Sequence, residues 1–329
     1  MRPVAGRATV SRVLIVAAIG GNALLRRGEP LTHAAQQRNL ETACDALAPL
    51  AHEHRLVLTH GNGPQVGLLA LEDEKGGGFP LDVLDAETEG MIGYLLDREL
   101  RSRLPGQEVA TLLTQVRVSP GDPAFGAPSK PVGPVYTASE AERAHRKHGW
   151  TLAPDGTGYR RVVPSPQPLE ILGLAGVQLL VERGFVVICG GGGGIPVMPD
   201  SDGVLRGVEA VIDKDLLAAL LAERLGADLL LLLTDVNGAV RDWGTPEARP
   251  IKTTTPGRLR RLDFAAGSMG PKVEAACRFV ERTGGEAVIG PLAEAATLPE
   301  RGGTRVIPAR RASRRPGREP APSRPRSRH

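Results

Sequence analysis

The chain has 329 residues, 41% of them hydrophobic and 24% charged, which fits one large α/β domain or two smaller globular domains. Aromatic residues make up only 3%, so we exclude stacking on aromatic platforms as the main binding mode. The net charge is +4, but residues 309–329 contain eight arginines and one glutamate, which leaves residues 1–308 at about −3. The body of the protein is therefore mildly acidic.

The chain begins with an N-terminal extension, residues 1–12, which carries three arginines ahead of the apolar run 13–19. Such an order is also found in signal peptides. This run, however, ends in Gly20-Gly21-Asn22 without a small-residue cleavage pattern, and it is too short to cross a bilayer. We interpret it as the first buried strand and expect a cytoplasmic protein without a membrane segment.

Strand-length apolar runs then alternate with helical patterns along the chain. The predicted strands are residues 13–19, 56–59, 109–113, 186–189, 229–233 and 287–289, and the predicted helices are residues 34–52, 86–103, 169–182, 209–225 and 272–283. This alternation predicts an α/β fold with a mostly parallel central sheet covered by helices on both faces. Thr234 and Asp235 follow a run of five leucines, where the carboxyl edge of such a sheet binds ligands.

Residues 116–168 break this rhythm with many prolines and glycines and only short β-like pieces. A long irregular segment inside a domain often serves as a lid or a binding loop, although a simple surface excursion gives the same pattern. We predict a protruding subdomain inserted in the N-terminal half, and Lys130 is its candidate functional residue.

Four glycine-bearing segments stand where we expect apolar strands to end. They are Gly20-Gly21-Asn22, Gly61-Asn62-Gly63, residues 190–194 with Gly192 and Gly193, and Gly267-Ser268-Met269-Gly270-Pro271-Lys272. A backbone that brings its N–H groups close to a phosphate has no room for a Cβ atom, so glycine is favoured there. Each segment alone is equally consistent with a tight turn. Their recurrence favours a site built around phosphate.

Three lysines have local settings that suit phosphate contacts: Lys130, Lys214 and Lys272. Phosphoryl transfer depends on positive charge aimed at the migrating group. Lys272 follows Pro271 at a helix start, so its charge and the helix N-terminus would act on the same anion. Asp213 and Asp215 flank Lys214; such a triplet also occurs on solvated surfaces or at magnesium sites, but we favour Asp215 as a residue that orients the lysine.

Several other motifs are absent or incomplete. The chain has no Gly-x4-Gly-Lys-Ser/Thr loop, and the glycine pattern from Gly61 to Gly67 is one residue too long for a dinucleotide fingerprint with Asp82 or Asp85 as its ribose acid. The three cysteines show no zinc or disulfide spacing, and we interpret Cys189 as a small buried hydrophobic residue. The seven histidines form no metal cluster, and we expect them in surface or loop positions.

The C-terminal tail, residues 309–329, is rich in arginine, proline and serine and lacks large apolar side chains. Such a segment cannot bury enough surface to offset the entropy of ordering. We expect it to be disordered and do not expect it to bind nucleic acid.

The chain resembles the carbamate kinases of the amino-acid kinase superfamily over about residues 13–308. The motifs that carry the resemblance are 59–67 (THGNGPQVG), 130–136 (KPVGPVY), 160–166 (RRVVPSP), 191–197 (GGGGIPV), 207–215 (GVEAVIDKD) and 267–276 (GSMGPKVEAA). Related amino-acid kinases carry a lysine just before the first Gly-Gly pair, whereas this chain has Ala18-Ile19, which favours the carbamate kinases.

The resemblance implies a three-layer α-β-α sandwich, a homodimer, and a carbamoyl-phosphate lobe over residues 13–205 with a nucleotide lobe over 206–308. It implies reversible transfer between carbamoyl phosphate with MgADP and carbamate with ATP, running towards ATP in arginine catabolism. It also implies three groups of site residues. The catalytic residues are Lys130, Lys214, Asp215 and Lys272, and the substrate-binding residues are Gly20, Gly21, Asn22, Gly61, Asn62, Gly63, Gly192 and Gly193. The nucleotide enters with Mg2+ and is bound by Thr234, Asp235, Met269 and Lys272.

Two alternatives remain open from the sequence. One is a kinase of another small carboxylate or phosphonate. The other is a non-catalytic sensor of carbamoyl phosphate or nucleotide, which we would expect to have lost one of the lysines that contact the migrating group.

Overall fold

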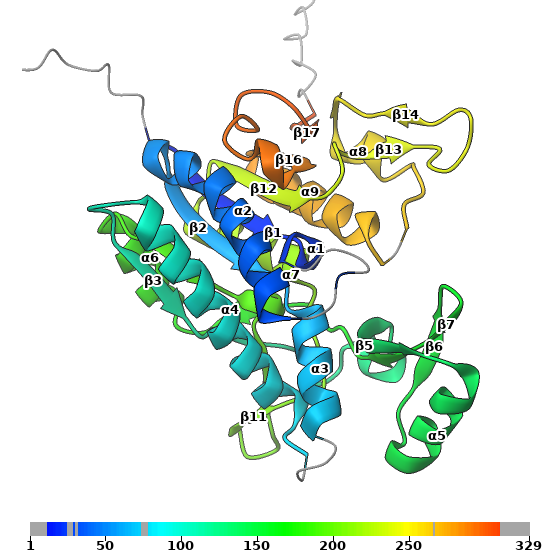
Figure 1. Cartoon of the computed structure of the whole chain (residues 1–329). Coiled ribbons are helices and arrows are strands. Elements are labelled where there is room, and N and C mark those ends of the chain that lie inside the picture. Colours follow the sequence, from blue (N-terminus) through cyan, green and yellow to red (C-terminus); the bar gives the residue numbers. More distant parts are fainter. Residues whose placement is uncertain (1–11, 25–28, 30–31, 74–77, 266, 310–329) are drawn as a thin grey trace, which may run out of the picture.

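Apolar runs form a central eight-stranded sheet in the computed structural model, which describes residues 12–24, 29, 32–73, 78–265 and 267–309 (Figure 1). In spatial order the strands are β15 (Thr253–Thr254), β17 (Thr304–Val306), β16 (Glu286–Pro291), β12 (Leu229–Thr234), β1 (Leu14–Ile19), β2 (Arg55–His60), β9 (Val186–Cys189) and β3 (Val109–Leu112). Every neighbouring pair is parallel except β16 and β17. The predicted mostly parallel α/β sheet is confirmed. The predicted tail, apart from Ala309, and the N-terminal extension before Arg12 lie outside the described residues.

The central strands are apolar at consecutive positions because both of their faces are buried. Along β1, Ile15, Ala17 and Ile19 pack into one core, whereas Val16 and Ala18 pack into the other. Leu229–Thr234 divides in the same way, with Leu231 and Leu233 on the first side. Successive side chains of a strand point to opposite faces, so a continuous apolar run is what a middle layer requires.

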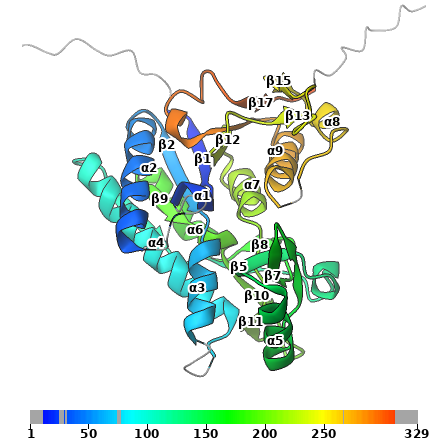
Figure 2. The same ribbon diagram turned by 45° about the vertical axis from the view of Figure 1, so that its right-hand side comes forward.

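Helices cover both faces of this sheet, and Figure 2 shows the sheet edge-on between them. On one face lie α2 (His33–Glu53) and α4 (Leu81–Arg103), and on the other lie α6 (Leu174–Glu182), α7 (Lys214–Leu225) and α9 (Met269–Thr283). The three-layer α-β-α sandwich is therefore present.

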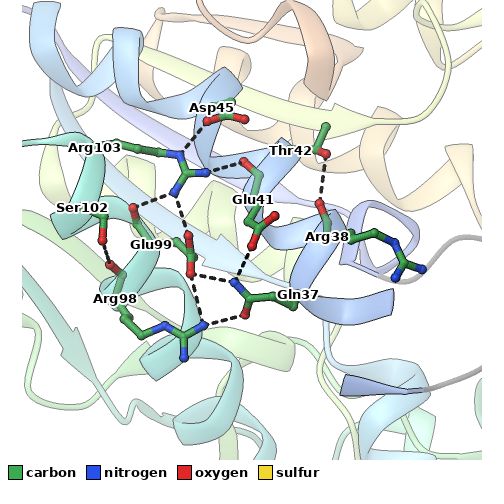
Figure 3. A network of polar contacts seen from close by, with 9 residues as sticks. All are labelled: Gln37, Arg38, Glu41, Thr42, Asp45, Arg98, Glu99, Ser102 and Arg103. Atoms are coloured by element: carbon green, nitrogen blue, oxygen red, sulfur yellow. Dashed lines mark hydrogen bonds and ion pairs between the residues drawn. The ribbon is translucent and has the colours of Figure 1, made fainter. Parts of the chain in front are cut away.

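A polar network ties α2 to α4 along their outer faces (Figure 3). Arg103 donates to Asp45 at 2.7 Å and to Glu99 at 2.7 Å, and Gln37 donates to Glu99 at 2.8 Å. The network in Figure 3 comprises Gln37, Arg38, Glu41, Thr42, Asp45, Arg98, Glu99, Ser102 and Arg103. These contacts fix how α4 lies against α2, and the opposite side of α4 faces the loops described below.

Three helix starts differ by five residues from the sequence prediction, whereas α2 and α9 begin within three residues of it. Helix α4 begins at Leu81 rather than at residue 86, behind Pro80. Helix α6 begins at Leu174 rather than at 169, because Glu170–Ile171 forms a short strand, β8, against β4 (Gln115–Arg117). Helix α7 begins at Lys214 rather than at 209, because Asp213 caps it by accepting from the N–H groups of Asp215 and Leu216.

The inserted segment contains a three-stranded antiparallel sheet that projects from the body (Figure 1). Its elements are β5 (Lys130–Tyr136), α5 (Ala138–His148), β6 (Leu152–Asp155) and β7 (Gly158–Val163). Strand β5 packs on α3 (Gly63–Asp73), where a Cβ atom on Gly67 would lie 2.2 Å from Gly133 Cα. Two glycine backbones therefore touch where the subdomain joins the body.

The remaining described elements are short. They are α1 (Gly21–Leu24), η1 (Pro123–Gly126), η2 (Gly191–Gly193), β10 (Ile195–Pro199), β11 (Leu205–Gly207), β13 (Val240–Arg241), β14 (Arg249–Pro250), α8 (Pro256–Leu259) and η3 (Leu292–Glu294). Strands β11, β10, β4 and β8 form a second small sheet, so the start of the inserted segment packs on the body. None of the helices in the described part of the chain combines the length and hydrophobicity needed to span a bilayer.

Candidate active site

The glycine segments meet at the carboxyl edge of the central sheet. Ile19 at the end of β1 pairs with Leu233 of β12 on one side and with His60 of β2 on the other. The residues that follow these strands, beginning with Gly20 and Gly61, therefore come out side by side. Crevices at this edge are where open α/β sheets bind their ligands.

Gly61 is required by close backbone contact. A Cβ atom there would lie 2.8 Å from the Gly21 N atom and 3.5 Å from Lys214 Cε. Gly20 has less need of glycine, since its Cβ would lie 3.3 Å from the Leu233 carbonyl oxygen. Asn22 lies in α1 at this edge, but its side chain is outside the described part of the structure.

Asp215 holds two of the candidate lysines. Lys214 Nζ donates to Asp215 Oδ1 at 2.6 Å, and Lys272 Nζ donates to Asp215 Oδ2 at 2.9 Å. The lysines come from the first turns of α7 and α9, whose close packing brings their starts together. Each ammonium side chain is only 11% exposed. One carboxylate thus places two buried cations beside each other.

The burial of this cluster shifts its pKa values. Burial lowers the pKa of Lys214 from 10.5 to about 8, with Asp215 opposing and Lys272 adding to the effect. Burial alone would raise the pKa of Asp215, but the charges of Lys214 and Lys272 hold it below its usual range. For Lys272, burial is the largest single effect and acts downward, yet Asp215 outweighs it and the pKa is raised. At neutral pH the cluster carries two ammonium groups against one carboxylate.

Lys130 reaches the same region from the protruding subdomain. Its Nζ donates to Asp213 Oδ2 at 2.6 Å, while the other oxygen of Asp213 accepts from the N–H of Asp215 at 2.9 Å. The structure thus brings Lys130, Lys214, Asp215 and Lys272 together, although they lie up to 142 positions apart in the sequence. The Asp-Lys-Asp triplet is not a solvated surface, because Asp213 and Asp215 are buried.

Loop 190–194, which follows β9, turns by means of left-handed glycines. Gly190, Gly192, Gly193 and Gly194 all have positive φ, between 65° and 110°. A Cβ atom on Gly192 would lie 2.3 Å from the Asn62 Nδ2 atom, and one on Gly193 would lie 2.2 Å from the Ile212 carbonyl oxygen. The loop therefore packs against Asn62 on one side and against the segment leading to α7 on the other.

Asn62 is oriented by two polar residues of α4 that the sequence reasoning did not place at the site. Its Nδ2 atom donates to Asp85 Oδ1 at 3.0 Å and to Thr88 Oγ1 at 2.9 Å. Asp85, considered above as the ribose acid of a dinucleotide site, therefore serves Asn62 instead. Asp85, Thr88 and Glu89 stand at positions i, i+3 and i+4, on one helix face. The sequence shows their common helix face but not their burial, so it could not assign them to the site.

His60 corrects another expectation. It was expected on the surface or in a loop, but it ends strand β2 and is fully buried. Burial lowers its pKa to about 4, so the ring is neutral at physiological pH. A Cβ atom on Gly191 would lie 2.3 Å from His60 Cε1, so the ring supports loop 190–194 from below.

The predicted nucleotide contacts lie farther along the same edge. Thr234 ends β12 next to β1, and its Oγ1 donates to Asp235 Oδ1 at 3.1 Å. Met269 begins α9, one turn before Lys272. The glycine segment around Gly267 precedes α9 and does not follow a strand of the sheet, which corrects its expected position. The described residues include no group of three or more His, Cys, Asp or Glu side chains placed to hold a metal ion.

The chain is similar to known proteins over most of its length. The model of the amino acid kinase family matches residues 13–290. A carbamate kinase from Rhizobium meliloti is 54% identical over 286 residues, covering 85% of this chain and 88% of that protein, and one from Haemophilus influenzae is 52% identical over 89% of this chain and 96% of that protein. The solved carbamate kinase from Giardia lamblia bound to AMP-PNP has a TM-score of 0.82 and 38% identity, covering 91% of this chain and 99% of that one. The chain therefore belongs to the amino acid kinase family and is a phosphotransferase of its carbamate kinase group.

Proposed function

We propose that the protein catalyses reversible phosphoryl transfer between carbamoyl phosphate with ADP and carbamate with ATP. The observation that carries the proposal is the pair of buried ammonium groups on Asp215, to which Lys130 adds a third cation nearby. The relatives named as carbamate kinases support the same substrate pair.

The chemistry needs cations more than it needs a base. The bond between phosphorus and the carbamate oxygen breaks, and a bond between phosphorus and a β-phosphate oxygen of ADP forms. Both the entering and the leaving oxygens are already anionic, so no proton has to be removed. What remains is to hold the two substrates in line and to balance the charge on the migrating group. Lys130, Lys214 and Lys272 serve that purpose, and Asp215 orients two of them.

We assign the two substrates to the two sides of this cluster. Carbamoyl phosphate would lie against the backbone groups and amides of Gly20, Gly21, Asn22, Gly61, Asn62, Gly63, Gly192 and Gly193. The nucleotide would lie over Thr234, Asp235 and Met269, at the β12 side of the sheet edge. This division corresponds to lobes of residues 13–205, with the subdomain of about 116–168, and 206–308, since β1, β2, β9 and β3 fall in the first and β12, β16, β17 and β15 in the second.

Mg2+ would enter with the nucleotide. Magnesium in phosphoryl-transfer sites is held by substrate phosphates, water and one or two carboxylates, and not by a cage of protein ligands. The carboxylates at this edge are those of Asp213, Asp215 and Asp235. These carboxylates would hold the metal together with the nucleotide, and the metal would neutralise negative charge on the phosphates beside the lysines.

We further propose that the reaction runs towards ATP in arginine catabolism, in the cytoplasm. Carbamoyl phosphate is a mixed anhydride, so its transfer to ADP is favourable. A reducing compartment suits Cys44, Cys189 and Cys277, whose thiols are free and buried.

A homodimer is also proposed. β3 is an edge strand of the central sheet, and three large apolar side chains are exposed on or next to it: Met91 and Tyr94 on α4, and Leu113 just after β3. Leu113 lies over Gly90 of α4, so these residues belong to one side of the molecule. Exposed apolar surface of this kind is typical of an interface.

The test is ATP formation from carbamoyl phosphate and MgADP, with acetyl phosphate as a competing donor. Turnover that prefers carbamoyl phosphate and is lost in Lys214→Ala would support the proposal. Preference for acetyl phosphate would indicate a kinase of another small carboxylate, and binding without turnover would indicate a sensor.

A further inference from the structure

Glu89 is a buried carboxylate on α4 that the proposed chemistry does not use. Only 1% of its surface is exposed. Its Oε1 accepts from the Gly191 N–H at 2.9 Å, and its Oε2 accepts from the Thr114 N–H at 3.2 Å. Burying a carboxylate this deeply costs free energy, and these two hydrogen bonds offset only part of that cost. The presence of Glu89 at this position therefore calls for an explanation.

Further hydrogen bonds connect Gly190, at the start of loop 190–194, to Thr114 and to β2. The Gly190 N–H donates to Thr114 Oγ1 at 2.9 Å, and Thr59 Oγ1 donates to the Gly190 carbonyl at 2.6 Å. Within the loop, the N–H groups of Gly193 and Gly194 donate to the carbonyls of Gly190 and Gly191. Residues from β2, from α4 and from the segment that follows β3 therefore hold the start of loop 190–194 in place.

These contacts use four of the five N–H groups of the loop. Gly190, Gly191, Gly193 and Gly194 each donate to an acceptor within the protein. Among the described residues, Gly192 is the member of the loop whose N–H has no such acceptor. Its backbone lies against Asn62, whose amide is in turn held by α4.

We propose that Glu89 is a positioning residue for the phosphoryl-transfer reaction: as a carboxylate it fixes Gly191, so that the neighbouring Gly192 N–H is presented to the anionic substrate. The inference rests on the proposed function and deepens it, because it names the donor of the loop and the group that orients this donor. Glu89 itself touches no substrate. A backbone donor fixed in advance costs no reorganisation when charge develops on the substrate.

The surroundings of Glu89 make its charge sensitive to pH near neutrality. Burial raises its pKa to about 7, with the N–H groups of Thr114 and Gly191 acting in the opposite direction. The ionisable groups around it are Asp85 on its own helix, His60 on β2 and Cys189 on β9, and Lys214 of α7 lies close enough to act on His60. Strand β10, which also packs on α4, carries no ionisable side chain.

Protonation of Glu89 would place a hydroxyl opposite the N–H of either Gly191 or Thr114, where that N–H now has an acceptor. As pH falls below about 7, Glu89 therefore loses one of its two contacts, and the loop loses part of its support. Glu89→Gln imitates this state permanently, because the amide nitrogen opposes an N–H group in the same way.

The test compares four purified proteins in the ATP-forming assay between about pH 5.5 and 9: the wild type, Glu89→Gln, Thr114→Val and the control Glu99→Gln. Glu99 lies on the same helix in the network with α2, away from the loop. For Glu89→Gln we expect the KM for carbamoyl phosphate to rise at least about fivefold, with the KM for MgADP changed less than about twofold, as for a lost hydrogen bond to one substrate. The wild-type fall in kcat/KM below about pH 7 should be absent in this variant.

Thr114→Val loses the acceptor for Gly190 and a hydroxyl that lowers the pKa of Glu89, so its KM for carbamoyl phosphate should rise, while the acid limb should remain and move to higher pH. Glu99→Gln should match the wild type in both readouts. Wild-type KM in folded Glu89→Gln and Thr114→Val, judged by thermal melts, would overturn the inference, and so would an acid limb that persists in Glu89→Gln. If Glu89→Gln does not fold, the inference is decided by the KM of Thr114→Val for carbamoyl phosphate and by the acid limb of the wild-type kcat/KM profile. A wild type that does not use carbamoyl phosphate refutes the proposed function itself, which is a separate result.

Discussion

Replacing Lys214 by methionine removes one of the two ammonium groups on Asp215 and keeps an unbranched side chain in its place. The side chain of Lys214 is only 11% exposed, so its aliphatic stem is packed and methionine preserves most of that packing. The variant therefore isolates the charge. Alanine would leave a void in addition.

The expected loss follows from the setting of the ammonium group. For a charge pair about 4 Å apart, at the effective dielectric constant of about 20 that suits partly buried sites, the interaction is about 4 kcal/mol. A transition-state loss of that size lowers kcat by about a thousandfold, which agrees with the hundred- to thousandfold loss found when one oxyanion donor is removed. Asp215 keeps Lys272 at 2.9 Å, so the variant does not leave a buried carboxylate alone.

The assay is ATP formation from carbamoyl phosphate and MgADP at saturating substrates, with thermal melting as the check on folding. Lys252→Met is the matched control, since Lys252 is exposed and lies on the other side of β12 from β1, near β15. A folded Lys214→Met protein that keeps more than a tenth of the wild-type kcat would refute the role of this charge.

Three further predictions follow from the described geometry. Because burial lowers the pKa of Lys214 to about 8, the ammonium is lost as pH rises, and kcat/KM should fall above about pH 8; a flat profile to pH 10 would show that this proton does not matter. Gly67→Ala would place a Cβ atom 2.2 Å from Gly133 Cα, so we expect the subdomain to shift. A small displacement of catalytic groups should lower kcat at least about tenfold. An unchanged crystal structure with full activity would contradict this prediction. Gly176→Ala, within α6, meets no neighbouring atom and should stabilise the protein by about 0.5–1 kcal/mol in urea unfolding, whereas a lower midpoint would show a constraint at that site.

The sheet was predictable because strands buried on both faces leave a strong signal. The five leucines before Thr234 become β12, and the apolar run before Gly20 becomes β1 beside it. Local sequence also revealed Lys214, through the two aspartates that flank it, and Lys272, through its place behind Pro271 at a helix start. What it could not reveal was that Asp215 holds both lysines, because that contact depends on how α7 packs against α9.

Other parts of the site could not be predicted from the sequence, because their positions also depend on how distant segments pack. Glu89 lies in the middle of a long helix in which polar and apolar residues alternate without a clean stripe, so its sequence neighbourhood suggests a solvated face. His60 was expected on the surface or in a loop because it precedes the Gly61-Asn62-Gly63 turn, but it ends β2 and is buried against loop 190–194. The start of α7 was placed too early because residues 210–212 are apolar, whereas the cap at Asp213 decides where the helix begins.

Asp213 has a consequence for communication between the two parts of the molecule. One of its oxygens receives Lys130 from the protruding subdomain, and the other receives the backbone of the first turn of α7. The subdomain and the helix end that carries Lys214 and Asp215 are thus joined through a single buried carboxylate, with no other residue between them.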